Sequence, residues 1–461
     1  MKRILTLALV ACFVLSAGLV SAKEMQFTGQ FEHALEWTDN VGLQDFAKTN
    51  NSEDDFYATQ RIRMYFQYVD SEVLRGVVGF EIDTNWGAPA ATGTKGTGGG
   101  ALGTDGTTVE VKHAYTDFNV GGVAFRVGLQ GLAWPSAVAG SPIYDNDVAG
   151  IVASYQFNDN FGLTAGWARL WDNNIGGDGA NGLDDEVDAF TVIAPITMDG
   201  WSLTPYVIYA KHGKDAAGAG TTAALSSLRA SNASALTDDL DIWWGGGAFE
   251  LSMFDPFVFG ADLIYGSVDG DKANQNDMAG WFFAAIATYK MDMVTPSLAL
   301  MYGTGEDDDP TDGSEVMPTL ANGGATNSGF GLTHFGFDGA AWTETGGILG
   351  GRTDYAALAL IIDDITFVEN LTHKLTIAYG KGTSDSDLVK KYPALGNLPI
   401  LTDEDSFWEV NFDSTYQIYE NLSLAGKFGY VNVDRDEDVW GNANSDLDNA
   451  YKFTVILRYN F

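Results

Sequence analysis

The sequence contains almost no cysteine. Cys12 is the only one among 461 residues, and it falls in an N-terminal stretch that we expect to be removed. A secreted chain without disulfides must be held together by backbone pairing and packing. Proline is sparse as well, with 11 residues, and no proline-rich or serine-rich linker interrupts residues 23–461. We therefore predict one domain over 23–461.

Basic residues are scarce. The chain has 25 Lys and Arg against 62 Asp and Glu. Without Lys2 and Arg3 of the N-terminal stretch, 23 basic residues face 62 acidic ones, a net charge of −39. Binding to phosphate backbones needs a basic face. The composition therefore argues against nucleic acid as a partner.

Long hydrophobic runs are also missing after the N-terminus. The longest, Tyr355 to Ile362, has eight residues, whereas a membrane helix needs about 20. If the chain crosses a membrane, it must do so as a closed barrel of strands, because only helices and barrels satisfy every backbone polar group in lipid.

The N-terminal stretch resembles a secretory signal peptide. Lys2 and Arg3 precede an apolar segment from Ile4 to Val20, and Ser21-Ala22 supplies small residues for cleavage. We predict a signal peptide over 1–22. The alternative is a lipoprotein signal ending at Cys12, but a lipidated cysteine should lead into a polar tether, and Phe13 to Val20 is mostly apolar.

Period-two alternation is what the mature chain does have. In the first segment the odd residues from Met25 to Trp37 are mostly apolar and the even residues are mostly polar. The last segment repeats this pattern from Tyr451 to Phe461. In a membrane barrel the apolar parity faces lipid and the polar parity lines water.

Segments of this kind recur along the whole chain, each near the ~10 residues that a tilted membrane strand needs. Short turns on one side alternate with long loops on the other, as in outer-membrane barrels. We predict an all-β transmembrane antiparallel barrel with short periplasmic turns and long extracellular loops. We expect 18 strands, with 16 as the alternative, at 24–37, 55–69, 73–86, 108–119, 122–132, 149–158, 161–171, 187–197, 201–211, 239–250, 256–266, 279–290, 293–303, 354–364, 371–381, 404–418, 421–434 and 451–461.

The C-terminal strand that ends in Phe461 is similar to the assembly signal of outer-membrane barrels. Together with the loop rhythm and the motif Val109 to Tyr115, it makes the mature chain resemble trimeric general porins of the Gram-negative outer membrane, most of all the homotrimeric porins of sulfate-reducing bacteria. The resemblance implies a passive diffusion channel for small hydrophilic solutes and ions, with no required cofactor. Its expected partners are membrane lipid, lipopolysaccharide and two further copies of the chain. Small residues such as Ala284-Ala285 and Ala356-Ala357 would let barrels abut.

Signs of an enzyme are weak. The five histidines include no pair three or four residues apart, and no Gly-x-Ser-x-Gly motif occurs. Gly98 to Gly103 formally matches a dinucleotide fingerprint, but no helix pattern follows it. We predict that the protein is not an enzyme. A barrel lipase or protease is the alternative from another class.

Charges on the predicted strands fall on the lumen parity. Any charged residue on a membrane strand does so, because facing lipid costs about 2–4 kcal/mol for Arg or Lys. A cluster near the strand centres is more informative, because a pore is narrowest there. We predict a basic wall at the constriction, formed by Arg61, Arg63, Arg126 and Lys427.

The resemblance further implies that the loop 133–148 folds back into the bore. Trp134, Pro135 and Pro142 would stiffen it, and Asp145 and Asp147 would face the arginines. Such opposed charges set a transverse field. Because charges at a narrow waist act on an ion more strongly than screened loop charges, we predict good passage of small anions. A porin that prefers small anions such as sulfate is the alternative reading.

Close carboxylates in the predicted loops suit Ca²⁺ or Mg²⁺. The candidate ligands are Asp307, Asp308 and Asp309 in one tract and Asp436 and Asp438 in another. The alternative is that these tracts are simply solvated acidic loops.

Overall fold

The structure is a computed structural model of the chain. It describes residues 23–40, 55–88, 100–103, 107–138, 140–172, 185–216, 238–270, 277–309, 313–320, 353–391, 401–441, 445 and 447–461. The predicted signal peptide, 1–22, and Gly98 of the possible dinucleotide fingerprint lie outside the described residues.

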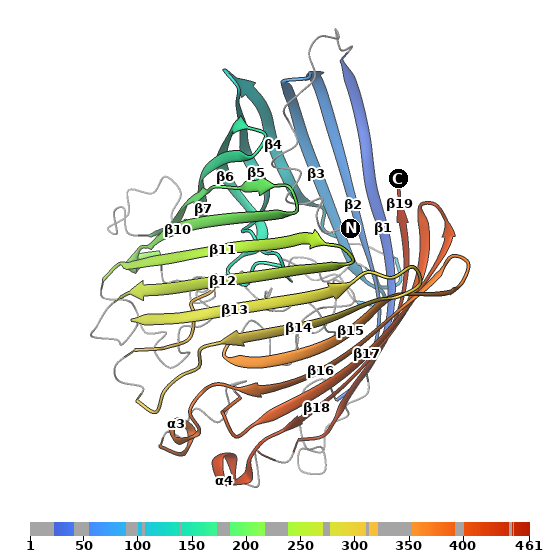
Figure 1. Cartoon of the computed structure of the whole chain (residues 1–461). Helices are drawn as coiled ribbons and strands as arrows, with labels where there is room; N and C mark the ends of the chain where they lie inside the picture. Colours follow the sequence, from blue (N-terminus) through green and yellow to red (C-terminus); the bar gives the residue numbers. More distant parts are fainter. Residues whose placement is uncertain are drawn as a thin grey trace.

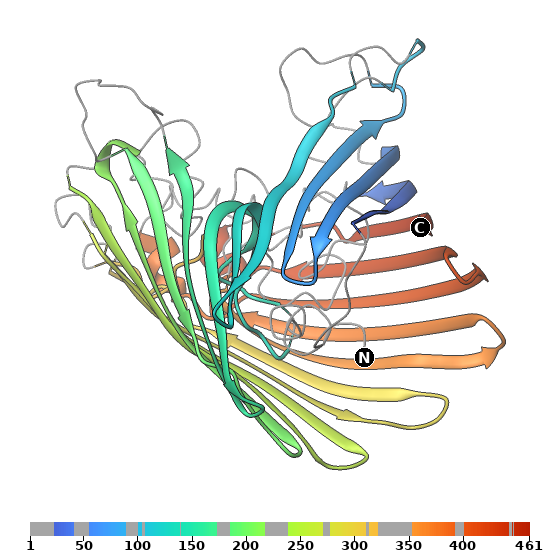
Figure 2. The ribbon, with the colours of Figure 1, turned by 90° about the horizontal axis from the view of Figure 1, so that it is seen from above.

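One antiparallel sheet contains all the named strands, and it closes on itself where β1 pairs with β19. Figure 1 shows the strands side by side around the barrel, and Figure 2 shows the view from above. The strands are β1 (Glu24–Asp39), β2 (Asp55–Ser71), β3 (Leu74–Asn85), β4 (Glu110–Val120), β5 (Val123–Ala133), β6 (Asp145–Asn158), β7 (Phe161–Asp172), β8 (Glu186–Ile193), β9 (Ile196–Met198), β10 (Trp201–His212), β11 (Leu240–Phe254), β12 (Phe257–Asp269), β13 (Met278–Tyr289), β14 (Thr295–Gly303), β15 (Tyr355–Val368), β16 (Leu371–Gly382), β17 (Ser406–Tyr419), β18 (Leu422–Asp434) and β19 (Ala450–Asn460).

The barrel wall consists of eighteen strands, because β8 and β9 are two parts of one interrupted strand. Both pair with β10, and the break between them contains Pro195, which has no backbone N–H to donate to a ladder. The prediction of eighteen strands in a closed antiparallel barrel is confirmed, and the alternative of sixteen is wrong.

Closure brings the two ends of the described chain together at the side of the short turns. Residues Gln30 to Asp39 of β1 pair with Asn460 to Tyr451 of β19. The backbone N–H of Gly29 donates to the carbonyl of Phe461 at 2.9 Å, and the ring of Phe461 lies 5.1 Å from that of Phe27. The terminal aromatic residue therefore helps to seal the seam.

The outer surface is apolar because the lipid parity of each strand carries large hydrophobic side chains. Leu263, Leu298, Leu358 and Phe412 are examples, each more than 40% exposed. Tyrosine and tryptophan gather near the strand ends, as in Trp37 and Tyr68. No helix among the described residues is long and apolar enough to span a membrane.

At the side opposite the short turns, the structure describes three short helical segments: η1 (Lys214–Ala216), α3 (Ser386–Lys391) and α4 (Glu437–Trp440). Val389 of α3 packs against Val439 and Trp440 of α4. Asp405 fixes α4 by accepting hydrogen bonds from Trp440 Nε1 at 2.8 Å and from the Asp436 N–H at 2.9 Å. The ends of β17 and β18 therefore carry a small folded cap.

Candidate functional site

The lumen has two halves of different chemistry. We call the inner faces of β7 to β15 the apolar half and those of β1 to β5 and β16 to β19 the charged half. In the apolar half Ile208, Trp244, Ile264 and Phe282 are each no more than 1% exposed. They are buried because two chain segments cover them from inside the barrel.

The first inward segment comprises residues 134–138 and 140–144. β4 stops pairing with β5 at Ala114–Leu129, but β5 and β6 continue to pair up to Ala133–Asp145. The hairpin end therefore leaves the wall, and in Figure 2 the teal strands turn toward the middle of the barrel. Gly128 lies at the departure point with φ 130°, a conformation that favours glycine.

Contacts on the far wall show where this segment goes. Trp134 is 3% exposed, and its Nε1 donates to Thr191 Oγ1 on β8 at 3.2 Å. The backbone N–H of Ala137 donates to Asp262 on β12 at 2.7 Å. The first inward segment thus crosses the lumen and packs on the apolar half.

A second inward segment, residues 313–320, lies beside the first. The N–H of Leu320 donates to the carbonyl of Ile143 at 2.8 Å. Trp244 Nε1 donates to the carbonyl of Pro318 at 2.7 Å. Met317 is fully buried. The two segments pack on the apolar half as part of one hydrophobic core, which also reaches Phe407, Val431 and Val433 near the loop ends of β17 and β18.

The charged half carries a continuous ion network on β2 and β3. Arg61 makes a two-pronged bond to Asp83, with N–O distances of 2.9 and 3.0 Å. Its Nη2 also lies 3.4 Å from Glu81, and Arg63 pairs with the same glutamate. Both arginines are therefore neutralised by carboxylates of the neighbouring strand, an arrangement typical of bidentate arginine pairs.

Asp147 joins this network from the inward hairpin. Its carboxylate lies 2.5 Å from Lys112 Nζ and 3.0 Å from His113 Nε2, and Lys112 is also 3.7 Å from Glu81. A β-bulge makes this contact feasible: Gly79 pairs with His113 but Phe80 pairs with Val111, so Lys112 is the extra residue. Two neighbouring side chains can then reach one carboxylate.

Arg126 belongs to a separate group nearer the short turns. It bonds Asp117 at 2.7 and 2.9 Å, and its guanidinium lies 4.1 Å from the ring centre of Tyr115. Asp117 also binds Arg75 at 2.7 Å. On β3, Arg75 is six residues from Glu81, or about 20 Å along the strand.

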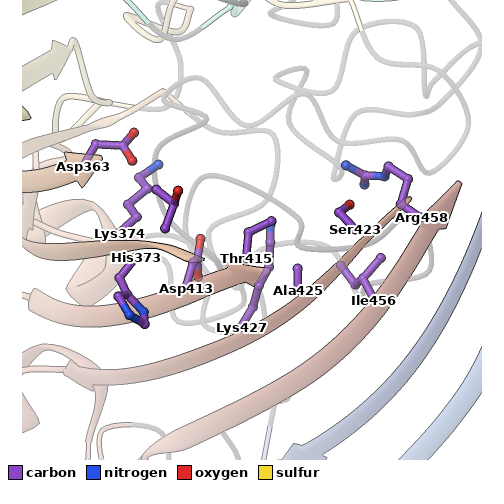
Figure 3. Close-up of a pocket in the computed structure, with 11 residues that line it drawn as sticks. Asp363, His373, Lys374, Asp413, Thr415, Ser423, Ala425, Lys427, Ile456 and Arg458 are labelled. Atoms are coloured by element: carbon purple, nitrogen blue, oxygen red, sulfur yellow. The ribbon is translucent and has the colours of Figure 1, made fainter. Parts of the chain in front are cut away.

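Lys427 lies on another part of the wall, beside a cavity of about 290 Å³. Lys374, Asp413 and Lys427 are direct neighbours across β16, β17 and β18. Figure 3 shows these side chains beside the cavity, which is also lined by Asp363, Thr372, His373, Thr415, Ser423, Ala425, Ile456 and Arg458. Arg458 pairs with Glu32 at 2.5 Å, whereas neither lysine makes an ion pair within the described part of the chain.

These positions revise the predicted constriction. The loop bounds 133–148 are wrong, because β5 extends to Ala133 and β6 begins at Asp145. Asp145 and Asp147 are therefore strand residues, and Asp147 meets Lys112 and His113 rather than an arginine. Residues 134–138 and 140–144 do lie inside the barrel, and their role as a constriction stays a prediction. Arg61 and Arg63 come together, but Arg126 and Lys427 lie in two other groups.

Sequence reasoning overlooked several important residues. Strand parity places Glu81 in the lumen but does not show that it links Arg61, Arg63 and Lys112. Parity likewise places Asp262 in the lumen without indicating a role. The bulge at Lys112 cannot be predicted from the alternation of apolar and polar residues, because one extra residue looks like a shift in the strand boundary. An acidic lumen residue on the strand next to two predicted cations, Arg61 and Arg63, is a usable signal for Glu81.

The predicted cation ligands have other partners. Asp308 pairs with Lys391 of α3, and the Asp309 N–H donates to Asp307 at 2.8 Å. Asp436 caps α4 by accepting from the N–H groups of Asp438 and Val439. Over the described ranges, no three acidic or histidine side chains are grouped closely enough to hold a metal ion. A divalent cation in these loops stays a prediction, which a loss of thermal stability on adding chelator would support.

Comparisons with known proteins identify the type of fold. No family model matches the sequence, and no curated protein matches it. Among solved structures, the chain is similar to Pseudomonas aeruginosa OpdQ, with a TM-score of 0.56 at 11% identity over 95% of this chain and 99% of that one. It is similar to P. aeruginosa OccK8 (OprE), with 0.55 at 10% over 95% and 98%, and to P. aeruginosa OpdL, with 0.55 at 13% over 95% and 99%.

These three neighbours are outer-membrane porins. At such low identity the likeness concerns the fold, and it agrees with the closed barrel and the apolar outer surface described above. The chain therefore has the 18-stranded fold of the porins of the Gram-negative outer membrane.

Proposed function

We propose that this chain is a porin, a passive diffusion channel for small hydrophilic solutes and ions. The observation that carries the proposal is the division of the lumen. The inward segments fill the apolar half with side chains, which leaves the part of the charged half around Arg61, Arg63 and Lys427 as the surface that water and solutes can follow. The fold supports the same function, since its neighbours are channels.

The constriction that we propose lies between the inward hairpin and the wall of β2 to β4. Asp147 approaches that wall through Lys112 and His113, and Asp145 begins β6 beside it and is exposed. Arg61 and Arg63 continue the charged surface through Glu81. Alternating positive and negative groups across a narrow bore orient dipolar solutes and favour small ones.

A preference for small anions is the second part of the proposal. Arg61 and Arg63 are neutralised by Asp83 and Glu81, so they attract a passing anion less than the sequence suggested. Lys374 and Lys427 flank Asp413 without an ion pair among the described residues. Asp363 and Asp413 balance the charge of these lysines in the cavity, but the two ammonium groups can still bind a small anion such as sulfate directly.

Conductance in planar lipid bilayers tests both parts. A porin should give large open steps without substrate or energy source, and no steps would contradict the channel function. In a salt gradient, the double change Lys374→Gln and Lys427→Gln should shift the reversal potential toward cations. Lys381→Gln is the matched control, because Lys381 is on β16 too but has the exposed, outward parity. Equal shifts in both variants would contradict the anion preference while leaving the channel function intact.

A homotrimer is the assembly that we propose from the resemblance to porins of sulfate-reducing bacteria, with lipid and lipopolysaccharide around it. The outer face of β1 and β2 supports this, because His33 and Gln60 pair in register as two polar residues of the outward parity. Polar groups facing lipid are costly, and a second copy would cover them. The expected contacts at Ala284 and Ala357 are wrong, since both are buried on the lumen side.

Electrophoresis without heating tests the assembly. The wild-type protein should run as a high-mass species that collapses to the monomer on boiling. Gln60→Trp should weaken that species by steric conflict at this polar pair. Val207→Trp, on the exposed outer face of β10 away from β1 and β2, should leave it unchanged. A wild-type monomer at every protein concentration in mild detergent would contradict the trimer.

A further inference from the structure

Asp262 is a carboxylate buried on the apolar half of the lumen. Its residue is 3% exposed, and within the described chain no basic side chain pairs with it. Burying a charge without a counter-ion is strongly unfavourable unless hydrogen bonds replace the lost water. The three groups that do so all come from the first inward segment.

The three donors form a compact turn. Ser136 Oγ lies 2.6 Å from Asp262 Oδ2, the Ala137 N–H lies 2.7 Å from Oδ1, and the Val138 N–H lies 3.1 Å from Oδ2. Ser136 Oγ also accepts from the Gly140 N–H at 3.2 Å. One hydroxyl thus closes the turn and ties it to the wall. Hydrogen bonds to an ionised acceptor are roughly twice as strong as neutral ones.

The wall is shaped to receive this turn. A Cβ atom on Gly260, two residues before Asp262 on β12, would lie 2.9 Å from the carbonyl oxygen of Ala137. Real side chains essentially never approach backbone so closely, so only glycine lets the turn lie flat against the strand. The glycine and the aspartate therefore recognise the same three-residue tip.

The rest of the segment is held at other points. Trp134 is bound to Thr191, and Ile143 is bound to Leu320. Between these anchors, the described hydrogen bonds that hold the tip to the barrel wall are those to the Asp262 carboxylate. Because β12 blocks movement in one direction, a released tip moves away from the wall, toward the charged half where solutes pass.

We propose that Asp262 is a positioning residue that keeps the pore open, by holding the tip of the first inward segment against β12. The apolar half then does more than fill space, because the buried Asp262 carboxylate within it keeps the inward segment out of the open part of the bore. Loss of the latch should appear as intermittent partial closures. The conductance of the fully open state should not change, since the charged wall is untouched. This inference rests on the proposed channel function.

Single-channel recording of four variants tests the latch. In Asp262→Asn an amide NH₂ replaces one acceptor oxygen and faces donors, so closures should become more frequent by about tenfold or more. Gly260→Ala should produce the same closures without altering any charge or hydrogen-bonding group, because its new methyl group displaces Ala137. Ser136→Ala should give an intermediate rate, since it removes one donor of three.

Glu250→Gln is the control. Glu250 is the cross-strand neighbour of Gly260 on β11, so this change removes a negative charge beside the latch. Among the described residues, no hydrogen bond joins Glu250 to the inward segment. It should leave the closure rate at the wild-type value. A comparable rise in Glu250→Gln and Asp262→Asn would show that charge alone acts, and would overturn the latch.

The proposal stays testable even if some of the variants fail to assemble into barrels. If the Asp262 and Gly260 variants do not form barrels, Ser136→Ala carries the test, and wild-type gating in that folded variant contradicts the proposal. Wild-type gating in folded Asp262→Asn and Gly260→Ala overturns it directly. If the wild-type protein itself does not conduct, it is the proposed channel function that fails.

Discussion

In the apolar half of the lumen Trp244 and Phe282 each expose 1% of their surface, whereas in the charged half the side chains of Arg61 and Arg63 expose 18% and 30%. Both sets of residues have the inward parity of their strands. The apolar set is covered by chain segments that fold in from the strand ends, and the charged set faces water. The interior of one barrel therefore contains two environments.

This difference shows how the two tasks of a pore are separated. Packed side chains are held at close to crystal density, so the apolar half gives the hairpin a firm base. The charged half then only has to present groups to solutes, and its ion pairs neutralise one another across neighbouring strands. Each half can be disturbed separately, which makes the comparison testable.

The largest expected effect comes from breaking the apolar half. Trp244→Ala should lower the free energy of unfolding by about 3–5 kcal/mol, because it opens a cavity under the second inward segment and removes the bond to Pro318. Trp243→Ala is the control: the neighbouring tryptophan is 49% exposed on the outer face and should cost much less. Denaturant titration, followed by the heat-dependent shift on electrophoresis, measures both. Equal losses would mean that the inside of this half is not a core.

A second effect should appear in selectivity rather than stability. Glu81→Gln leaves Arg63 without its described ion-pair partner, while Arg61 keeps Asp83 and Lys112 keeps Asp147. The reversal potential in a salt gradient should move toward anions, with a stability loss of about 1–3 kcal/mol. Asp117→Asn, in the group nearer the short turns, should move it less. An unchanged reversal potential in Glu81→Gln would place the ion path away from this wall.

The smallest expected effect is the pH dependence of stability that comes from Glu315, a residue outside the strands. Burial raises the pKa of Glu315 above its ordinary value, and nearby Asp307 and Glu306 raise it further. A raised folded-state pKa means that this group's stability contribution is present below the unfolded pKa and is lost as pH rises through the folded pKa. Glu315→Gln should therefore be slightly more stable than wild type at neutral pH. Melting curves at pH 4 and pH 7 measure the effect, and a variant that is less stable only at pH 7 would contradict it.

Much of the barrel follows from alternation and turn spacing. The alternation from Phe27 to Trp37 predicts strand β1, and that from Tyr451 to Phe461 predicts strand β19. In both, it also predicts which face of the strand meets lipid. These patterns are readable because one face meets lipid and the other meets water. Strand number followed from the short turns, whose residues break the pattern at regular intervals.

The apolar half could not be predicted in the same way. In β10, Tyr206, Ile208 and Ala210 face inward while Val207 and Tyr209 face outward, so both parities are hydrophobic. The expectation that the inner parity lines water is wrong there. What covers an inner face depends on segments far along the chain, such as 313–320, and no local pattern records that contact.

The candidate site was only partly predictable for a related reason. That Arg61 and Arg63 lie in the lumen follows from parity, but their neutralisation depends on cross-strand register with Asp83 and Glu81. Register was not determined by the sequence at the precision of one residue. The role of Asp147 further required a hairpin that leaves the wall and a bulge at Lys112.

The central claim is that solutes follow the charged half and not the apolar half. Because Cys12 is the only cysteine and lies in the predicted signal peptide, single cysteines can be placed on a clean background and reacted with a negatively charged methanethiosulfonate while current is recorded. We predict that a cysteine replacing Thr415, beside the cavity in the charged half, changes the current promptly on reaction. A cysteine replacing Ala284, which is 1% exposed in the apolar half, should give no change. Prompt reaction at Ala284, with none at Thr415, would contradict the account.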